Sequence, residues 1–189
     1  MTNKQVIRLF IAARLPLDLT ALLVAAQKLL DNTAMKCSPT RAEHLHLTLR
    51  FIGEVQAETA QRVRQWFEGL ELPKLLDGNC VFDRYGSFPG KEGATVWAGL
   101  KCSDGIRDLQ RRIEQGLQSL GQPAENKPWI PHITLARRVQ PEQSLPAILS
   151  GLPPCQIEGA FREFVLFRSE FTQQGMRYTP LLIKESDLN

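Results

Sequence analysis

Two short stretches decide the fold class of this chain: "HLHLTL", residues His44–Leu49, and "PHITLA", residues Pro131–Ala136. Each contains a histidine, an apolar residue, a threonine and a leucine in that order. The chain has only three histidines, and His46 and His132 occupy the same place in the two stretches, 86 positions apart. A scarce side chain that recurs in one pattern indicates an internal duplication.

The residues around the two stretches predict a strand–helix–strand unit that occurs twice. Val6–Ala12 and residues 94–102 are apolar segments of strand length, and each motif has the period-two alternation of a half-buried strand. Pro16 suits the start of the first intervening helix, and Ser103 or Asp104 can cap the second. Helical spacing gives each helix one apolar face, made by Leu19, Leu22, Leu23, Ala26 and Leu30 in the first and by Ile106, Leu109, Ile113, Leu117 and Leu120 in the second.

The remaining segments complete a prediction of an α+β fold. A helix follows the first unit, with Val63, Trp66, Phe67 and Leu70 on one side. Residues 80–88 predict a strand, and residues 161–184 predict a hairpin that turns at "TQQG". We therefore expect residues 1–189 to form a single domain of two pseudo-symmetric lobes, each with one H-x-T motif.

The composition excludes several classes of protein. A net charge of +3 excludes a polybasic nucleic-acid coat. No segment approaches the roughly 20 continuous apolar residues of a membrane span, and Arg8 and Arg14 interrupt the start of the chain, so we expect no membrane partner and a cytoplasmic location. The four cysteines are scattered without a C-x-x-C pair, which predicts reduced, mostly buried thiols.

The repeated motif can supply acid–base chemistry. Residues i and i+2 of a strand point to one face, so His46 lies beside Thr48, and His132 lies beside Thr134. If the two repeats face each other, two imidazoles and two hydroxyls meet in one cleft. One imidazole can accept a proton while the other donates one, and the hydroxyls can bind phosphate oxygens. This arrangement suits cleavage of a phosphodiester without a metal ion.

Two alternatives remain open at this point. His44 and His46 could bind zinc with His132 as a third ligand, which would make the protein a metallohydrolase. Against that alternative, Ile130 stands where the second repeat would need a counterpart of His44. The other alternative is an RNA- or nucleotide-binding module without turnover, although binding alone does not require two imidazoles.

Further residues beside the motifs carry a resemblance to a known family. The two H-x-T motifs, "FIGEV" after the first, "NKPWIPHITLARR" around the second and "RYTPL" near the C-terminus resemble the two-histidine (2H) phosphoesterases, and within them the bacterial RNA 2′,3′-cyclic phosphodiesterases, also named 2′-5′ RNA ligases. The resemblance implies two antiparallel-rich sheets around a central cleft, with helices outside. It also implies hydrolysis of RNA-terminal 2′,3′-cyclic phosphates to 2′-phosphates without metal or cofactor, and reversible 2′-5′ joining of tRNA halves. The expected partners are RNA ends or small cyclic nucleotides, and we expect a monomer.

The resemblance also assigns roles to the motif residues. It implies that His46 is the general acid for the 3′-oxygen, that His132 is the base that activates water, and that Thr48 and Thr134 bind phosphate oxygens. Arg137 matches an arginine of the family near the phosphate.

Other positions near the motif ends are candidates for the substrate rim. Strict alternation would point Arg138 into the cleft, so the preference for Arg137 requires a twist or bulge in the strand. Phe51 matches an aromatic residue that can stack on a base, although it could equally pack in the core. The weaker rim candidates are Arg50, which shares the parity of His46, and the aromatic residues Trp129 and Tyr178.

Overall fold

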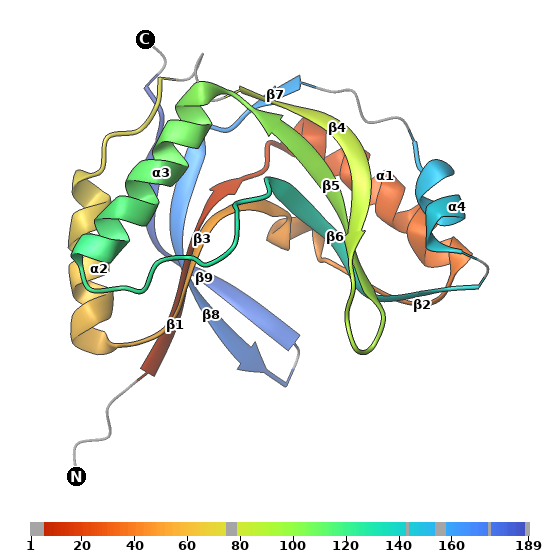
Figure 1. The fold of residues 1–189 in the computed structure, drawn as a ribbon, viewed down its shortest axis with the longest axis horizontal. Coiled ribbons are helices and arrows are strands. Elements are labelled where there is room, and N and C mark those ends of the chain that lie inside the picture. Colours follow the sequence, from red (N-terminus) through yellow and green to blue (C-terminus); the bar gives the residue numbers. More distant parts are fainter. Residues whose placement is uncertain (1–5, 75–78, 143, 154–157, 174, 188–189) are drawn as a thin grey trace.

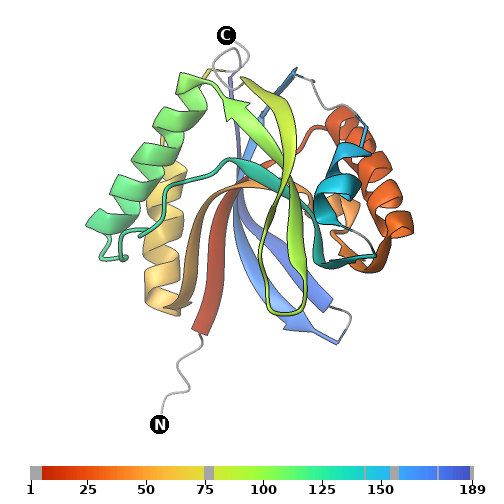
Figure 2. The ribbon, with the colours of Figure 1, turned by 45° about the vertical axis from the view of Figure 1, so that its right-hand side comes forward.

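The computed structural model describes residues 6–74, 79–142, 144–153, 158–173 and 175–187. These residues form two antiparallel sheets with helices on the outer flanks (Figures 1 and 2). The first sheet has the order β3-β1-β8-β9, with bounds β1 Val6–Arg14, β3 His46–Gln56, β8 Glu163–Thr172 and β9 Gly175–Glu185. The second has the order β2-β6-β5-β4-β7, with bounds β2 Ala34–Pro39, β4 Asn79–Phe88, β5 Ala94–Cys102, β6 His132–Pro141 and β7 Glu158–Ala160. The predicted α+β class and the outer position of the helices are confirmed.

Two pairs of helices flank the sheets. Their bounds are α1 Leu17–Thr33, α2 Ala57–Gly69, α3 Asp104–Ser119 and α4 Leu145–Ser150, and a short 3₁₀ helix covers Ala42–His44. Helices α2 and α3 lie on one side of the strands, and α1 and α4 lie on the other (Figures 1 and 2). Helix α1 contacts β2 and β6 of the second sheet, and α2 contacts β1, β3 and β9 of the first.

The duplication is visible in the strand pairing. Strands β1 and β3 are antiparallel neighbours that enclose α1 in sequence, and β5 and β6 are antiparallel neighbours that enclose α3. The order β3-β1-β8-β9 of one sheet therefore matches β6-β5-β4-β7 of the other. The predicted repeat of strand, helix and strand is confirmed, and so is the hairpin near the C-terminus, where Thr172 pairs with Gly175.

Strand β2 was not predicted, and it changes how the two halves of the chain are connected. It follows α1 in the first half of the chain but pairs with β6 in the second sheet. The first sheet in turn contains β8 and β9 from the C-terminal part of the chain. Each sheet therefore contains strands from both halves of the sequence.

Helix α3 illustrates how the local sequence produces these elements. The Ser103 side chain caps the helix by accepting a hydrogen bond from the backbone N–H of Ile106 at 3.4 Å. Ile106, Leu109, Ile113 and Leu117 are all buried. A Cβ atom at Gly116 would collide with the Trp66 indole, so the close approach of α2 to α3 requires glycine there.

The strand alternation breaks at the same place in both motifs. From His46 to Phe51 and from His132 to Arg137, the side chains are half-buried, buried, half-buried, buried, buried and exposed in turn. In β3, Leu49 lies between two residues that pair with consecutive residues of β1; in β6, Leu135 lies between two residues that pair with consecutive residues of β5. Each strand therefore has a bulge directly after its motif threonine.

The cysteines and the membrane-span prediction concern the chain as a whole. Cys80 and Cys102 are buried free thiols, and Cys37 is a half-buried one; Cys155 lies outside the described residues. Within the described ranges, no helix has both the length and the apolar character required to cross a membrane.

Candidate active site

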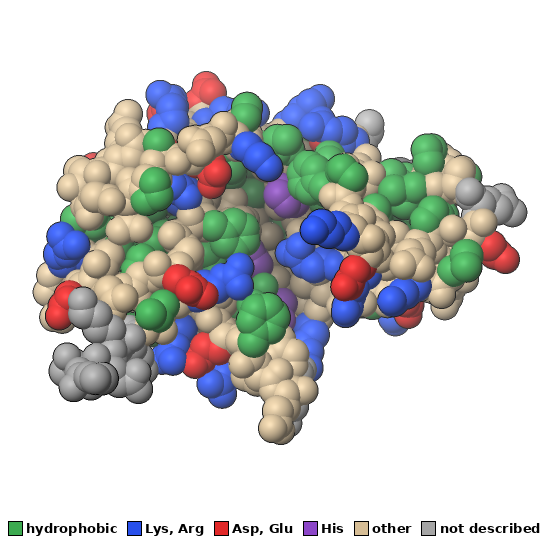
Figure 3. All heavy atoms as spheres, turned by 60° about the horizontal axis from the view of Figure 1, so that its bottom comes forward, with side chains coloured by type: hydrophobic (Ala, Val, Ile, Leu, Met, Phe, Trp, Pro, Cys, Tyr) green, Lys and Arg blue, Asp and Glu red, His purple; other side chains and the backbone are tan. Residues whose placement is uncertain are grey.

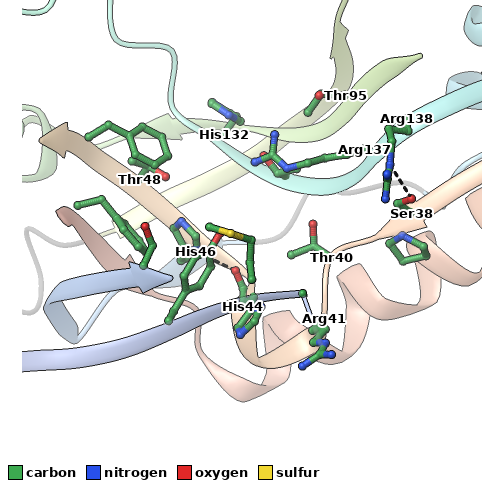
Figure 4. Close-up of a pocket in the computed structure, with 18 of the residues that line it drawn as sticks. Ser38, Thr40, Arg41, His44, His46, Thr48, Thr95, His132, Arg137 and Arg138 are labelled. Atoms are coloured by element: carbon green, nitrogen blue, oxygen red, sulfur yellow. Dashed lines mark hydrogen bonds between the residues drawn. The ribbon is translucent and has the colours of Figure 1, made fainter. Parts of the chain in front are cut away.

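A pocket of about 880 Å³ lies between the two sheets, and both motifs line it (Figures 3 and 4). Strand β3 contributes His46 and Thr48, and strand β6 contributes His132 and Thr134. The residues that alternate with them point the other way and are buried, namely Leu47, Leu49, Ile133 and Leu135. The structure thus brings the four motif side chains into one pocket, and their catalytic roles stay predictions.

The two imidazoles are held in the same way. His46 Nδ1 lies 2.7 Å from the carbonyl oxygen of His44, and His132 Nδ1 lies 2.7 Å from that of Ile130. Because a carbonyl oxygen only accepts hydrogen bonds, Nδ1 of each neutral ring carries the hydrogen. Each Nε2 therefore has a lone pair that can accept a proton, or can donate one once the ring is charged.

Both histidines favour the neutral form in the free protein. Burial lowers the pKa of His46 to about 4, and the charges of His44, Arg137 and His132 act in the same direction, against the hydrogen bond to the His44 backbone. Burial also lowers the pKa of His132, again with a contribution from Arg137 and against the hydrogen bond to Ile130. Arg137 therefore acts electrostatically on both imidazoles.

Aromatic rings surround each imidazole. The His46 ring centroid lies 5.1 Å from that of Phe10 and 5.6 Å from that of Tyr178. The His132 centroid lies 5.1 Å from that of Phe88 and 6.0 Å from that of Trp97. These contacts exclude water from the ring faces, which explains why burial is the main cause of the lowered pKa values.

Arg137 lines the pocket, as the resemblance implied (Figure 4). The bulge at Leu135 reverses the parity of β6, so the fifth residue after His132 points to the same face as the histidine. Arg138 also lines the pocket, because β6 has a second irregularity at that point. Both arginines therefore face the cleft, whereas the sequence predicted that only one of them would do so.

Phe51 occupies the equivalent position in the first repeat, five residues after His46. It lines the pocket, is 50% exposed, and its ring centroid lies 5.7 Å from that of Phe10. Its position as a rim residue agrees with the sequence prediction, and the alternative of a core position is wrong. An exposed aromatic ring at this place can stack on a base.

The prediction that Arg50 lies at the rim is wrong. Its side chain is only 9% exposed, and its Nε atom donates to Glu114 Oε2 at 2.5 Å. The other guanidinium nitrogens donate to the backbone oxygens of Pro123 and Phe51 and to Glu125. The bulge at Leu49 turns Arg50 away from the pocket, where it joins β3 to α3 and to the segment after α3.

Trp129 is also not a rim residue, because it is not among the residues that line the pocket. Its indole packs against the core, and its Nε1 donates to the backbone oxygen of Thr48 at 3.0 Å. It therefore fixes the segment that leads into His132 against the strand that carries His46.

Tyr178 does line the pocket, together with His44. Their ring centroids lie 4.5 Å apart, and His44 precedes β3 as the last residue of the 3₁₀ helix. Tyr178 is thus a rim residue in position, and His44 presents its ring to the pocket and its carbonyl oxygen to His46.

Several residues of the pocket were missed from the sequence. Arg8 and Phe10 of β1 line it, as do Ser38 and Thr40 near β2 and Phe171 and Met176 of the β8–β9 hairpin. A signal existed for the first two, because they are two residues apart in a predicted strand and so share a face. The β2 residues had no such signal, since that strand was not predicted.

The metal alternative required His44, His46 and His132 to form one ligand set. In the part of the chain that the structure describes, no group of three or more histidine, cysteine or acidic residues is arranged to bind a metal ion. In addition, the Nδ1 atom of His46 contacts the carbonyl oxygen of His44, so this ring nitrogen is not available to a metal ion.

Two antiparallel sheets that each present one H-x-T motif to a shared pocket define a protein of the two-histidine type. The family model described as the 2′-5′ RNA ligase superfamily matches residues 20–170. The chain belongs to this superfamily.

Individual relatives agree with this family. The chain is 35% identical to a protein of Thermus thermophilus named RNA 2′,3′-cyclic phosphodiesterase, over 92% of this chain and 87% of that protein. It is 32% identical to an Escherichia coli protein of the same name, over 76% of each chain. The crystal structure of E. coli LigT complexed with 3′-AMP superimposes with a TM-score of 0.78 at 26% identity, covering 96% of this chain and 99% of that one.

Proposed function

We propose that this protein is an RNA 2′,3′-cyclic phosphodiesterase that hydrolyses the cyclic phosphate at an RNA end to a 2′-phosphate. The observation that carries the proposal is the equivalent placement of His46 and His132 in one pocket, each with Nδ1 bound to a carbonyl oxygen and Nε2 available for proton transfer. The name shared by the curated relatives supports the same reaction.

The reaction requires one base and one acid. The Nε2 of His132 takes a proton from water as the water oxygen attacks phosphorus. The bond between phosphorus and the ribose 3′-oxygen breaks, and the Nε2 of His46 gives its proton to that oxygen. The phosphate stays on the 2′-oxygen. A 5′-hydroxyl in place of water undergoes the same proton transfers and gives a 2′-5′ linkage, so the proposal includes reversible joining.

Other residues of the pocket stabilise the phosphate. The hydroxyls of Thr48 and Thr134 donate hydrogen bonds to its oxygens, and the Arg137 guanidinium balances its negative charge. The bound anion also raises the pKa of nearby imidazoles. This effect is needed, because His46 is neutral in the free protein at neutral pH and must be protonated to act as the acid.

The proposed pocket is suited to a nucleotide. Phe51 and Tyr178 provide aromatic surface for a base beside the phosphate-binding residues. An 880 Å³ cavity exceeds what a phosphate alone needs. We therefore propose RNA ends or small cyclic nucleotides as the ligands. We also propose that residues 1–189 form a single domain that acts as a monomer in the cytoplasm.

Hydrolysis of a 2′,3′-cyclic nucleotide in excess chelator, with the product phosphate position resolved, tests the reaction. We expect a 2′-phosphate product without added metal. His46→Ala and His132→Ala should each reduce the rate about 10²–10⁴-fold, and His44→Ala, which removes the third imidazole, should retain most of it. Loss of activity in chelator that zinc restores would contradict the metal-independent reaction, and unchanged rates in both variants would contradict the two-histidine mechanism.

A further inference from the structure

Two consecutive arginines of β6 face the same pocket. In a regular strand, Arg137 and Arg138 would point to opposite faces. Here Val96 pairs with Ala136 and Ala94 pairs with Val139, so the two arginines lie together opposite the single residue Thr95. This bulge brings both side chains to the pocket wall (Figure 4).

The backbone at Arg138 has an unusual conformation. Its φ angle is 55°, and no other non-glycine residue has a positive φ in the described ranges. The turn between β4 and β5 lies directly against this point, since a Cβ atom at Gly93 would meet the backbone carbon of Arg138 at 2.8 Å. A left-handed residue with a long side chain is disfavoured, and such conformations cluster at ligand-binding sites.

The two arginines occupy different parts of the pocket. Arg137 reaches toward the histidines and acts on the pKa of both. Arg138 reaches toward β2, where its Nε atom donates to Ser38 Oγ at 3.2 Å, and its Nη1 atom lies 3.9 Å from Glu92 Oε2. The Arg138 and Glu92 side chains are 54% and 71% exposed, so their long contact is weak.

We propose that Arg138 and Ser38 bind a second phosphate of the substrate, namely the phosphate on the 5′ side of the ribose that carries the cyclic phosphate. All other phosphates of such an RNA end lie on this side. A guanidinium can bind a phosphate through two parallel hydrogen bonds, and Ser38 holds its Nε side in place. This inference rests on the proposed function. It means that the pocket prefers a terminal nucleotide with a phosphate on its 5′-oxygen to a nucleoside 2′,3′-cyclic phosphate that lacks one.

The test compares the binding of adenosine 2′-monophosphate and adenosine 2′,5′-bisphosphate by calorimetry at low ionic strength. We expect the unmodified protein to bind the bisphosphate roughly tenfold more tightly, as a charge-assisted hydrogen bond would give. Arg138→Gly should abolish most of this preference. Glycine adopts positive φ freely, so this variant removes the side chain and keeps the bulge. Arg111→Ala removes an equal charge from the exposed surface of α3 and should keep the preference.

Two results would overturn the inference: no preference in the unmodified protein, or the same preference in Arg138→Gly, with or without an equal loss of affinity for both ligands. An equal loss of affinity for both ligands would place Arg138 at the same phosphate as Arg137. Glu92→Gln removes the competing carboxylate and should strengthen the preference; a weaker preference would also count against the inference.

These binding measurements do not depend on turnover. If the protein binds the bisphosphate as expected but does not hydrolyse cyclic phosphates, the proposed reaction is wrong and the second phosphate site stands. If it hydrolyses them and shows no preference, only the second site is wrong.

Discussion

His46 should be almost entirely neutral at a pH where an ordinary histidine is half protonated. Its pKa is about 4, against an ordinary value of 6.5, so about one ring in 300 is charged at pH 6.5. The difference between the two pKa values corresponds to a free energy of about 3.4 kcal/mol in favour of the neutral ring, at 1.36 kcal/mol per pH unit. Proton NMR of the three imidazoles, assigned with His44→Ala and His132→Ala, measures each pKa directly. A His46 ring that titrates near 6.5 would refute the claim that burial controls its charge.

A pair of charge-removing variants tests the electrostatic part of the same reasoning. Arg137→Gln should raise the pKa of His46 and of His132, because the Arg137 charge lowers both. Arg41→Gln is the matched control, since the Arg41 charge lowers the pKa of His44. If Arg137→Gln changes the pKa of His44 as much as the pKa values of His46 and His132, Arg137 does not act selectively on the motif histidines.

Bound phosphate should have the opposite effect to Arg137. Adenosine 2′-monophosphate places an anion beside the two imidazoles, which favours their charged forms. The pKa of at least one ring should therefore rise when the ligand is bound, and the pH–rate profile should be a bell that belongs to the coupled pair. If neither pKa rises in the complex, no imidazole is charged near neutral pH and the proposed acid is not available.

Three further variants or conditions give separate tests. Phe51→Ala should weaken nucleotide binding by about 1–3 kcal/mol through lost stacking, with inorganic phosphate affinity as the unaffected control in calorimetry. Arg50→Met should lower the free energy of unfolding in urea by about 1.5–3 kcal/mol, since it leaves the half-buried Glu114 carboxylate without its charge-assisted hydrogen bond; an unchanged midpoint would show that the pair contributes little. Because the folded pKa of His46 lies below the unfolded one, stability should fall as pH drops from about 6.5 toward 4, and His46→Gln should reduce that fall in urea titrations at several pH values.

The sequence predicted the elements whose apolar pattern is strong. The motif strands, the helix with Ile106 and Leu109 on its buried face, and the C-terminal hairpin all exist. Strand β2 was missed because "AMKCSP" has no alternation and all of its residues are exposed or half-buried. Its position depends on pairing with β6, which is more than 90 residues away in sequence, and local patterns carry no information about such a partner.

The two misplaced rim residues, Arg50 and Trp129, have different physical causes. Arg50 was assigned to the cleft because strict alternation places it on the face of His46. The bulge at Leu49 reverses that parity, and Arg50 then finds acidic partners on α3 and after it. Trp129 was a rim candidate as an aromatic residue at a strand end, but its indole N–H donates to the backbone oxygen of Thr48 instead. Neither contact partner is close in sequence, so neither could be predicted from a local window.

The duplication explains why strict alternation fails at the same place in both repeats. Each motif strand has its additional residue directly after the threonine, so alternation alone gives the wrong face for the two positions that follow it. The reversed parity sends the fourth residue after the histidine, Arg50 or Ala136, into the interior. It sends the fifth, Phe51 or Arg137, into the pocket. Two equivalent backbones thus present different chemistry at one position: an aromatic ring suited to a base from one sheet and a cation suited to a phosphate from the other. A symmetric pair of histidines can therefore bind an asymmetric substrate, because the asymmetry comes from the residue that each bulge turns into the pocket.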